Sequence, residues 1–189
     1  MSNETQGAPP AQAAPKFTPA PPRKAPKTGM PTEGFLIFAG LPKAGKTRLG
    51  ASIPGAVVID LERGGADRLD GWVQEVNDLQ TFREAMKWAI GDPKVKAIVV
   101  DSVDEVLDLL EEDILERHEL GSMMERKEGV NTWQELRKQV NAMVKRFKTC
   151  GKLIVGLAQY KEPKLDAEGR LVVTHNLNAP GKIGPYLCA

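Results

Sequence analysis

One segment of eight residues, Gly40-Leu41-Pro42-Lys43-Ala44-Gly45-Lys46-Thr47, limits the fold of this chain more than any other feature. It has the spacing GxxxxGK[ST], it follows a short apolar run, and the residues after it suit a helix. A strand that leads through such a loop into a helix directs backbone N–H groups and the positive end of the helix at one point. The segment therefore predicts an α/β fold with a phosphate-binding loop.

The positions within this loop predict individual roles. Gly40 and Gly45 let the backbone wrap closely around phosphate oxygens. The Lys46 ammonium is expected at the β- and γ-phosphates of ATP, where it also assists catalysis, and the Thr47 hydroxyl is expected at Mg²⁺. The expected nucleotide contacts are Gly40, Leu41, Pro42, Lys43, Ala44, Gly45, Lys46, Thr47 and Arg48.

Apolar runs alternate with longer periodic segments along the chain. Four runs, at residues 34–40, 56–60, 95–101 and 152–159, are rich in β-branched residues and bounded by turn residues. A fifth and weaker run lies at residues 170–174. Runs of this kind are typical of strands that are buried on both faces of a sheet.

Helices are expected between these strands. Residues 78–90 carry apolar side chains at helical spacing. Ser102–Glu105 and Thr132–Glu135 have the spacing of capping boxes that open two more helices, the second of which ends at Gly151. Strands that alternate with helices predict a mostly parallel sheet with right-handed crossovers, flanked by helices.

Three polar residues follow predicted strands. Asp101 ends the third apolar run and is expected to hold Mg²⁺ together with Thr47. Glu62 lies just past the second run and could act as general base, although a solvated charged loop remains the alternative. Gln159 ends the fourth run and could sense the γ-phosphate through its amide, or could be an ordinary polar residue at a strand end.

Residues 1–33 differ in composition from the remainder of the chain. They hold 8 of the 14 Pro residues and few large apolar ones, so they cannot bury enough surface to offset the entropy of ordering. We expect a disordered Pro/Ala-rich tail at 1–33 and one domain at 34–189.

Composition excludes several classes of protein. The formal net charge of +1 argues against nucleic-acid binding by bulk charge alone. No apolar run has the length of a membrane span, and no secretory signal opens the chain, so a cytoplasmic protein is expected. Cys150 and Cys188 give neither metal-ligand spacing nor a disulfide framework.

Four motifs in one order resemble the RecA-like recombinase ATPases. The phosphate-binding loop comes first, followed by VIDLE (58–62), IVVDS (98–102) and LIVGLAQ (153–159). The resemblance implies that Glu62 activates water, that Asp101 is the Walker B aspartate and that Gln159 is the switch glutamine. With only a tail before the core, the chain looks like the core-only ATPases of bacteriophages that act as single-strand annealing recombinases, which would work in the bacterial cytoplasm.

The resemblance also implies single-stranded DNA as a partner. In the family, the loop after the switch glutamine and a second loop soon after it bind DNA, and the matching stretches here are 160–164 and 178–184. Lysines and arginines there could meet phosphates and tyrosines could stack on bases, with ordinary solvated loops as the alternative. The candidate DNA contacts are Tyr160, Lys161, Lys164, Arg170, Lys182 and Tyr186.

The same resemblance implies assembly into a homo-oligomeric filament or ring with ATP between protomers. Phe17-Thr18-Pro19-Ala20 fits the F-x-x-A pattern by which eukaryotic and archaeal relatives dock onto the next protomer, although a lone Phe in a tail is often incidental. A single-stranded-DNA-binding protein is a further candidate partner. The apolar end, Leu187-Cys188-Ala189, looks like the entrance to a strand and suggests a truncated core.

Two other functions remain open at this stage. A small-molecule kinase would need a lid rich in Arg, and the stretch 117–130, which we expect to be a mobile loop, holds only Arg117, Arg126 and Lys127. A binding module that uses nucleotide only as a structural ligand would need neither Glu62 nor Gln159.

Overall fold

The computed structural model describes residues 31–62 and 69–160. The chain divides into two units, 1–30 and 31–189, and everything below concerns the second. Several predicted features lie outside the described residues. These are the Phe17–Ala20 motif, nearly all of the predicted tail, the strand at 170–174, Cys188, and the DNA contacts Lys161, Lys164, Arg170, Lys182 and Tyr186.

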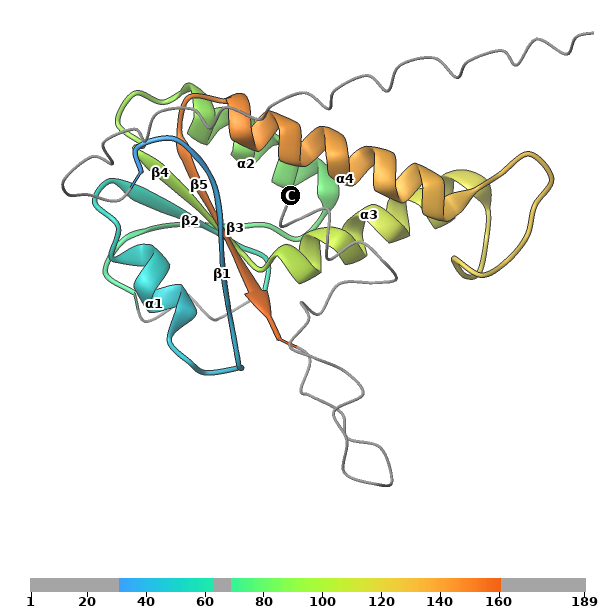
Figure 1. Ribbon diagram of the computed structural model, residues 1–189, viewed down its shortest axis with the longest axis horizontal. Helices are drawn as coiled ribbons and strands as arrows, with labels where there is room; N and C mark the ends of the chain where they lie inside the picture. Colours follow the sequence, from blue (N-terminus) through green and yellow to red (C-terminus); the bar gives the residue numbers. More distant parts are fainter. Residues whose placement is uncertain (1–30, 63–68, 161–189) are drawn as a thin grey trace, which may run out of the picture. The chain divides into compact units, whose positions relative to one another are not determined.

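A sheet of five parallel strands forms the centre of the described fold (Figure 1). The strands are β1 (Gly34–Gly40), β2 (Ala56–Asp60), β3 (Trp72–Glu75), β4 (Ala97–Asp101) and β5 (Leu153–Gln159). Their order across the sheet is β1-β5-β4-β2-β3, and every neighbouring pair is parallel. The predicted α/β fold with a parallel sheet is confirmed.

Helices cover both faces of this sheet. The helices are α1 (Lys46–Ala51), α2 (Leu79–Gly91), α3 (Val103–His118) and α4 (Thr132–Thr149). The short α1 lies on one face, whereas α2, α3 and α4 lie on the other (Figure 1). None of the helices in the described ranges is long and apolar enough to cross a membrane.

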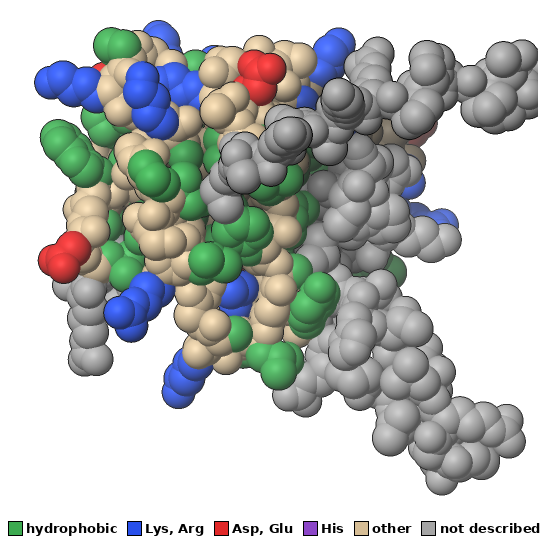
Figure 2. All heavy atoms as spheres, turned by 60° about the vertical axis from the view of Figure 1, so that its left-hand side comes forward, with side chains coloured by type: hydrophobic (Ala, Val, Ile, Leu, Met, Phe, Trp, Pro, Cys, Tyr) green, Lys and Arg blue, Asp and Glu red, His purple; other side chains and the backbone are tan. Residues whose placement is uncertain are grey.

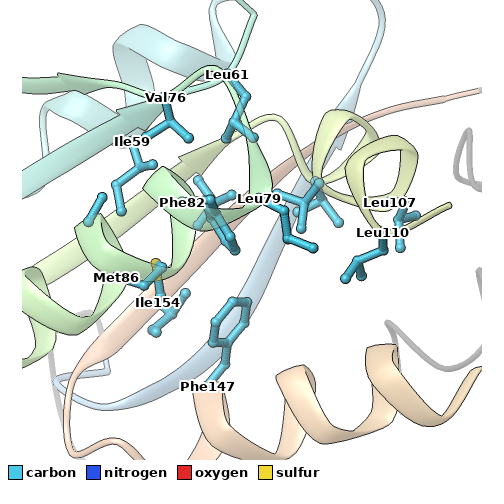
Figure 3. Packing of buried hydrophobic residues seen from close by; sticks show 14 of the residues in the cluster. Ile59, Leu61, Val76, Leu79, Phe82, Met86, Leu107, Leu110, Phe147 and Ile154 are labelled. Atoms are coloured by element: carbon cyan, nitrogen blue, oxygen red, sulfur yellow. The ribbon is translucent and has the colours of Figure 1, made fainter. Parts of the chain in front are cut away.

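Alternating strand residues supply two hydrophobic clusters. Ile59, Ile98 and Ile154 face the three-helix layer, where Phe82 and Met86 of α2 and Phe147 of α4 converge (Figure 3). Val58, Val99 and Val155 belong to the second cluster, which includes Ala51 of α1. Successive side chains of these central strands point to opposite faces of the sheet, and both faces are covered. The central strands therefore match the prediction of strands buried on both faces.

The start of α4 corrects one prediction. Asn131, not Thr132, is the N-cap, since its side-chain oxygen accepts the N–H of Gln134 at 3.0 Å. Thr132 is buried and donates its hydroxyl to the carbonyl of Met123 at 3.0 Å. Glu135 is engaged by Arg117 and His118. The Thr132–Glu135 capping box was therefore wrong, because tertiary contacts take both of its side chains.

The connection between α3 and α4 corrects a second prediction. A connection without helix or strand lies between α3 and α4 as predicted, but α3 continues through His118, so Arg117 belongs to that helix. Met123 is buried, and Lys127 donates to the carbonyl of His118 at 2.7 Å. The structure also contains the edge strand β3, which the sequence analysis did not predict.

Candidate functional site

The carboxyl ends of the strands bring the predicted site residues to one edge of the sheet. Gly40 pairs with Gln159, and Asp60 pairs with Asp101. β5 lies between β1 and β4, so the end of β5 stands between the phosphate-binding loop and Asp101. Ligands of open α/β sheets bind outside this edge.

The predicted phosphate-binding loop joins β1 to α1. Its residues from Leu41 to Gly45 are exposed, and Gly45 caps α1 in a left-handed conformation with φ of 81°. The Lys46 ammonium donates to the carbonyl of Gly40 at 3.2 Å and to that of Leu41 at 3.0 Å. The Lys46 side chain therefore lies over its own loop. A phosphate oxygen bound there could replace the two carbonyls as acceptor of the ammonium hydrogen bonds.

Close packing of α1 brings Thr47 to Asp101. Gly50 of α1 is buried against Val99 of β4, and a Cβ at position 50 would lie only 2.7 Å from Val99 Cγ1. One helical turn earlier, the Thr47 hydroxyl lies close enough to the Asp101 carboxylate to act on its pKa. The absence of a side chain at Gly50 thus sets the distance between the two predicted Mg²⁺ ligands.

The environment of Asp101 fits a divalent cation. Its side chain is 2% exposed, and its Oδ2 atom is buried without a hydrogen-bond partner among the described residues. Burial, with smaller contributions from the carboxylates of Glu62 and Asp60, raises the pKa of Asp101 to about 6, although the nearby Thr47 hydroxyl acts in the opposite direction. An unpartnered buried carboxylate oxygen is costly, and Mg²⁺ prefers oxygen ligands. Thr47 and Asp101 would hold the ion.

The two candidate water-activating residues contact each other. Gln159 Nε2 donates to Glu62 Oε1 at 3.3 Å, across 97 positions of sequence. Because β4 lies between β2 and β5, this hydrogen bond spans the end of β4 that carries Asp101. The backbone N–H of Glu62 donates to the buried Asp60 carboxylate at 3.0 Å, which orients the turn after β2.

A polar pocket of about 520 Å³ opens beside this pair. Three of its side chains are acidic, and repulsion from neighbouring carboxylates adds to burial in raising the pKa of Glu105. Water therefore has a route to the Glu62 carboxylate. The pocket is lined by Leu61, Glu62, Val76, Asn77, Glu105, Leu109, Glu112 and Gln159.

One residue at this edge was not predicted from the sequence. Asp104 Oδ2 accepts the backbone N–H of Gln159 at 2.9 Å. The available signal was its position three residues after Asp101, in the first turn of a helix that begins at a strand end. Of the candidate DNA contacts, the structure describes Tyr160, which follows Gln159 and is 36% exposed.

The parallel sheet, the loop between β1 and α1, and the Thr47–Asp101 pair define a P-loop nucleotide-binding domain. The sequence matches the family described as AAA domain over residues 35–182, and the chain belongs to this family. The prediction that the chain is related to P-loop ATPases is therefore confirmed. No curated protein matches the chain.

Proposed function

We propose that this protein is an ATPase that binds single-stranded DNA and acts as a recombinase or single-strand annealing protein. The observation that carries the proposal is the hydrogen bond between Gln159 and Glu62 beside Thr47 and Asp101. A site that only bound nucleotide would have no use for a carboxylate and an amide held together next to the metal ligands.

The proposed chemistry assigns each side chain one task. Lys46 would exchange its carbonyl acceptors for the β- and γ-phosphate oxygens of ATP. Bound Mg²⁺ supplies charge neutralisation between the phosphates. The Glu62 carboxylate would accept a proton from the water that attacks the γ-phosphorus, while the bond from that phosphorus to the β–γ bridging oxygen breaks and ADP leaves. Gln159 would hold the Glu62 carboxylate in place.

The coupling to DNA is proposed from chain connectivity. In the sequence, Gln159 is followed directly by Tyr160, and Lys161 and Lys164 come within the next five residues. DNA that contacts these residues, with Lys182 from the second loop, would act on the position of Gln159. On the face drawn in Figure 2, Lys and Arg lie mainly at the upper and lower margins with hydrophobic side chains between them. With a net charge of +1, binding would depend on a few basic groups repeated around an assembly.

The kinase alternative loses support from the connection between α3 and α4. Arg117 is engaged in ion pairs with Asp113 and Glu135, which join α3 to α4. Lys127 is engaged by the carbonyl of His118. We therefore retain the DNA-dependent ATPase as the single proposed function.

The rate of ATP hydrolysis with and without poly(dT), at low and at moderate salt, tests the proposal. We expect turnover in the presence of Mg²⁺, stimulation by DNA that weakens as salt rises, and loss of turnover in Lys46→Ala. Lys87→Ala, on the exposed side of α2, is the matched control. Hydrolysis that ignores DNA at both salt concentrations would overturn the DNA part, and nucleotide binding without hydrolysis would overturn the ATPase part.

A further inference from the structure

Gln159 is held at two points, and the second is Asp104 at the start of α3. The Asp104 carboxylate accepts the backbone N–H of Gln159 at 2.9 Å, while the Gln159 side chain donates to Glu62 at 3.3 Å. The first contact fixes the main chain of Gln159, and the second uses its side chain. Gln159 therefore connects Asp104 to Glu62, the proposed water-activating residue.

The strand ladder explains why the N–H of Gln159 needs such an acceptor. Successive N–H groups of a strand point to alternate sides. The N–H of Tyr160 donates to Gly40 on the β1 side, so the N–H of Gln159 points to the β4 side. β4 ends at Asp101, which is opposite Leu157, and no residue of that strand reaches the level of Gln159. The Asp104 side chain takes the place of the missing strand carbonyl.

Packing between α3 and β5 brings Asp104 within reach. Gly156 of β5 faces Val103, the first residue of α3, and a Cβ at position 156 would lie 2.5 Å from Val103 Cγ2. Only a residue without a side chain allows this approach. The first turn of α3 is therefore seated directly on β5, three residues before the strand ends at Gln159.

The surroundings of Asp104 disfavour the ionised form of its side chain. Burial raises the pKa of Asp104 to about 6, and repulsion from Glu62, Asp108 and Glu105 adds to the shift. The first turn of a helix and the hydrogen bond from Gln159 act in the opposite direction and do not prevail. A neutral acceptor of the same shape would make the same hydrogen bond with less repulsion, which gives a clean experimental contrast.

We propose that Asp104 is a positioning residue of the ATPase, which holds the backbone of Gln159 so that its amide meets the Glu62 carboxylate. This inference rests on the proposed function. Asp104 would act through Gln159 and not through a contact of its own with nucleotide.

The experiment compares ATP turnover and nucleotide affinity in three variants. Asp104→Leu keeps the shape but removes the acceptor, Asp104→Asn keeps an acceptor oxygen, and Asp108→Leu removes a neighbouring carboxylate of α3 that makes no contact with Gln159. At saturating ATP we expect Asp104→Leu to lower kcat about tenfold, because small displacements of catalytic groups are costly, with nucleotide Kd changed by less than about twofold. Asp104→Asn should restore kcat, and Asp108→Leu should resemble the wild type.

Two results would overturn the inference. One is equal kcat in Asp104→Leu and Asp108→Leu; the other is Asp104→Asn as slow as Asp104→Leu, which would assign the effect to charge and not to the hydrogen bond. If Asp104→Leu does not fold, Asp104→Ala carries the same comparison.

A failure of the proposed function would be visible in the wild-type chain, which would then not hydrolyse ATP at all. In that case, hydrogen exchange of the backbone N–H of Gln159 tests separately whether Asp104 holds this group. It should be about tenfold or more faster in Asp104→Leu than in Asp108→Leu, and equal exchange would overturn the hold on Gln159.

Discussion

The site has two halves that are built in different ways. The phosphate half consists of the loop from Gly40 to Thr47 together with Asp101, and its parts are joined by the short helix α1, which packs on Val99 of β4. The hydrolytic half consists of Glu62, Gln159 and Asp104, which meet across separations of 97 and 55 residues. The phosphate half is a motif of consecutive residues to which Asp101 is added as a predicted metal ligand. The residues of the hydrolytic half come together only when the sheet has folded. Damage to the first should lower nucleotide affinity, and damage to the second should lower rate at unchanged affinity.

The largest expected effect comes from Glu62→Gln in the hydrolytic half. The amide keeps an oxygen for Gln159 but cannot take a proton from water, so we expect kcat to fall by about 10²- to 10⁴-fold. Nucleotide affinity, measured by titration with a fluorescent ATP analogue, should not change. A parallel loss of affinity would show that the two halves are not separable.

The next largest effect is expected from Lys46→Ala in the phosphate half. Removal of the ammonium deletes a charge-assisted contact to two phosphates, so nucleotide affinity should fall by about 10²-fold. Isothermal titration calorimetry with ATP and Mg²⁺ measures this directly, with Lys87→Ala as control. Unchanged affinity in Lys46→Ala would contradict the assignment of the loop.

A smaller effect concerns the stability of the phosphate half without nucleotide. The pKa of Asp101 is raised to about 6, so the folded state binds more protons than the unfolded chain between that value and the ordinary value of 3.8. Stability should therefore fall as pH rises through this window and stay lower above it. Asp101→Asn should melt a few degrees higher than wild type at pH 8 without nucleotide, and the difference should shrink at pH 4.

Addition of Mg²⁺ and nucleotide at pH 8 should reverse that order, because only the wild type has the carboxylate that the ion needs. A wild type that melts no higher with Mg²⁺ and nucleotide than without them would argue against the metal site.

The smallest effects are expected from a matched pair of glycine substitutions. Gly50→Ala would press on Val99 and displace Thr47, whereas Gly156→Ala would press on Val103 and displace Asp104. Overpacking costs about 1–3 kcal/mol of stability, partly offset in α1 by about 1 kcal/mol of helix propensity. Gly50→Ala should reduce Mg²⁺-nucleotide affinity and Gly156→Ala should reduce kcat. A loss of kcat in Gly50→Ala together with a loss of Mg²⁺-nucleotide affinity in Gly156→Ala would contradict the division into halves.

The phosphate half and the central strands could be predicted from sequence because their signals are local. The GxxxxGK[ST] spacing and the β-branched runs each lie within a few consecutive residues. Glu62 and Gln159 could be named as candidates from their places after strands. Their hydrogen bond could not be foreseen, since it depends on β5 lying beside β4.

Two of the misses arise from contacts between separate elements, and the third from an exposed strand. Asp104 looked like an ordinary residue of a helical first turn, and its acceptor role arises because β4 ends two residues short of Gln159. The capping box at Thr132 failed because Met123 and Arg117 take its side chains. The strand β3 has four exposed residues, with Trp72 71% exposed, so it lacks the buried apolar pattern by which strands are recognised.

In the proposed function, Glu62 and Gln159 act as one unit in ATP hydrolysis. A double-mutant cycle on single-turnover hydrolysis, with Glu62→Gln, Gln159→Ala and both together, tests it most directly. We expect the double variant to be no slower than the slower single variant, because either change breaks the same unit. Rate losses that multiply would mean that the two residues act independently, and would contradict the claim.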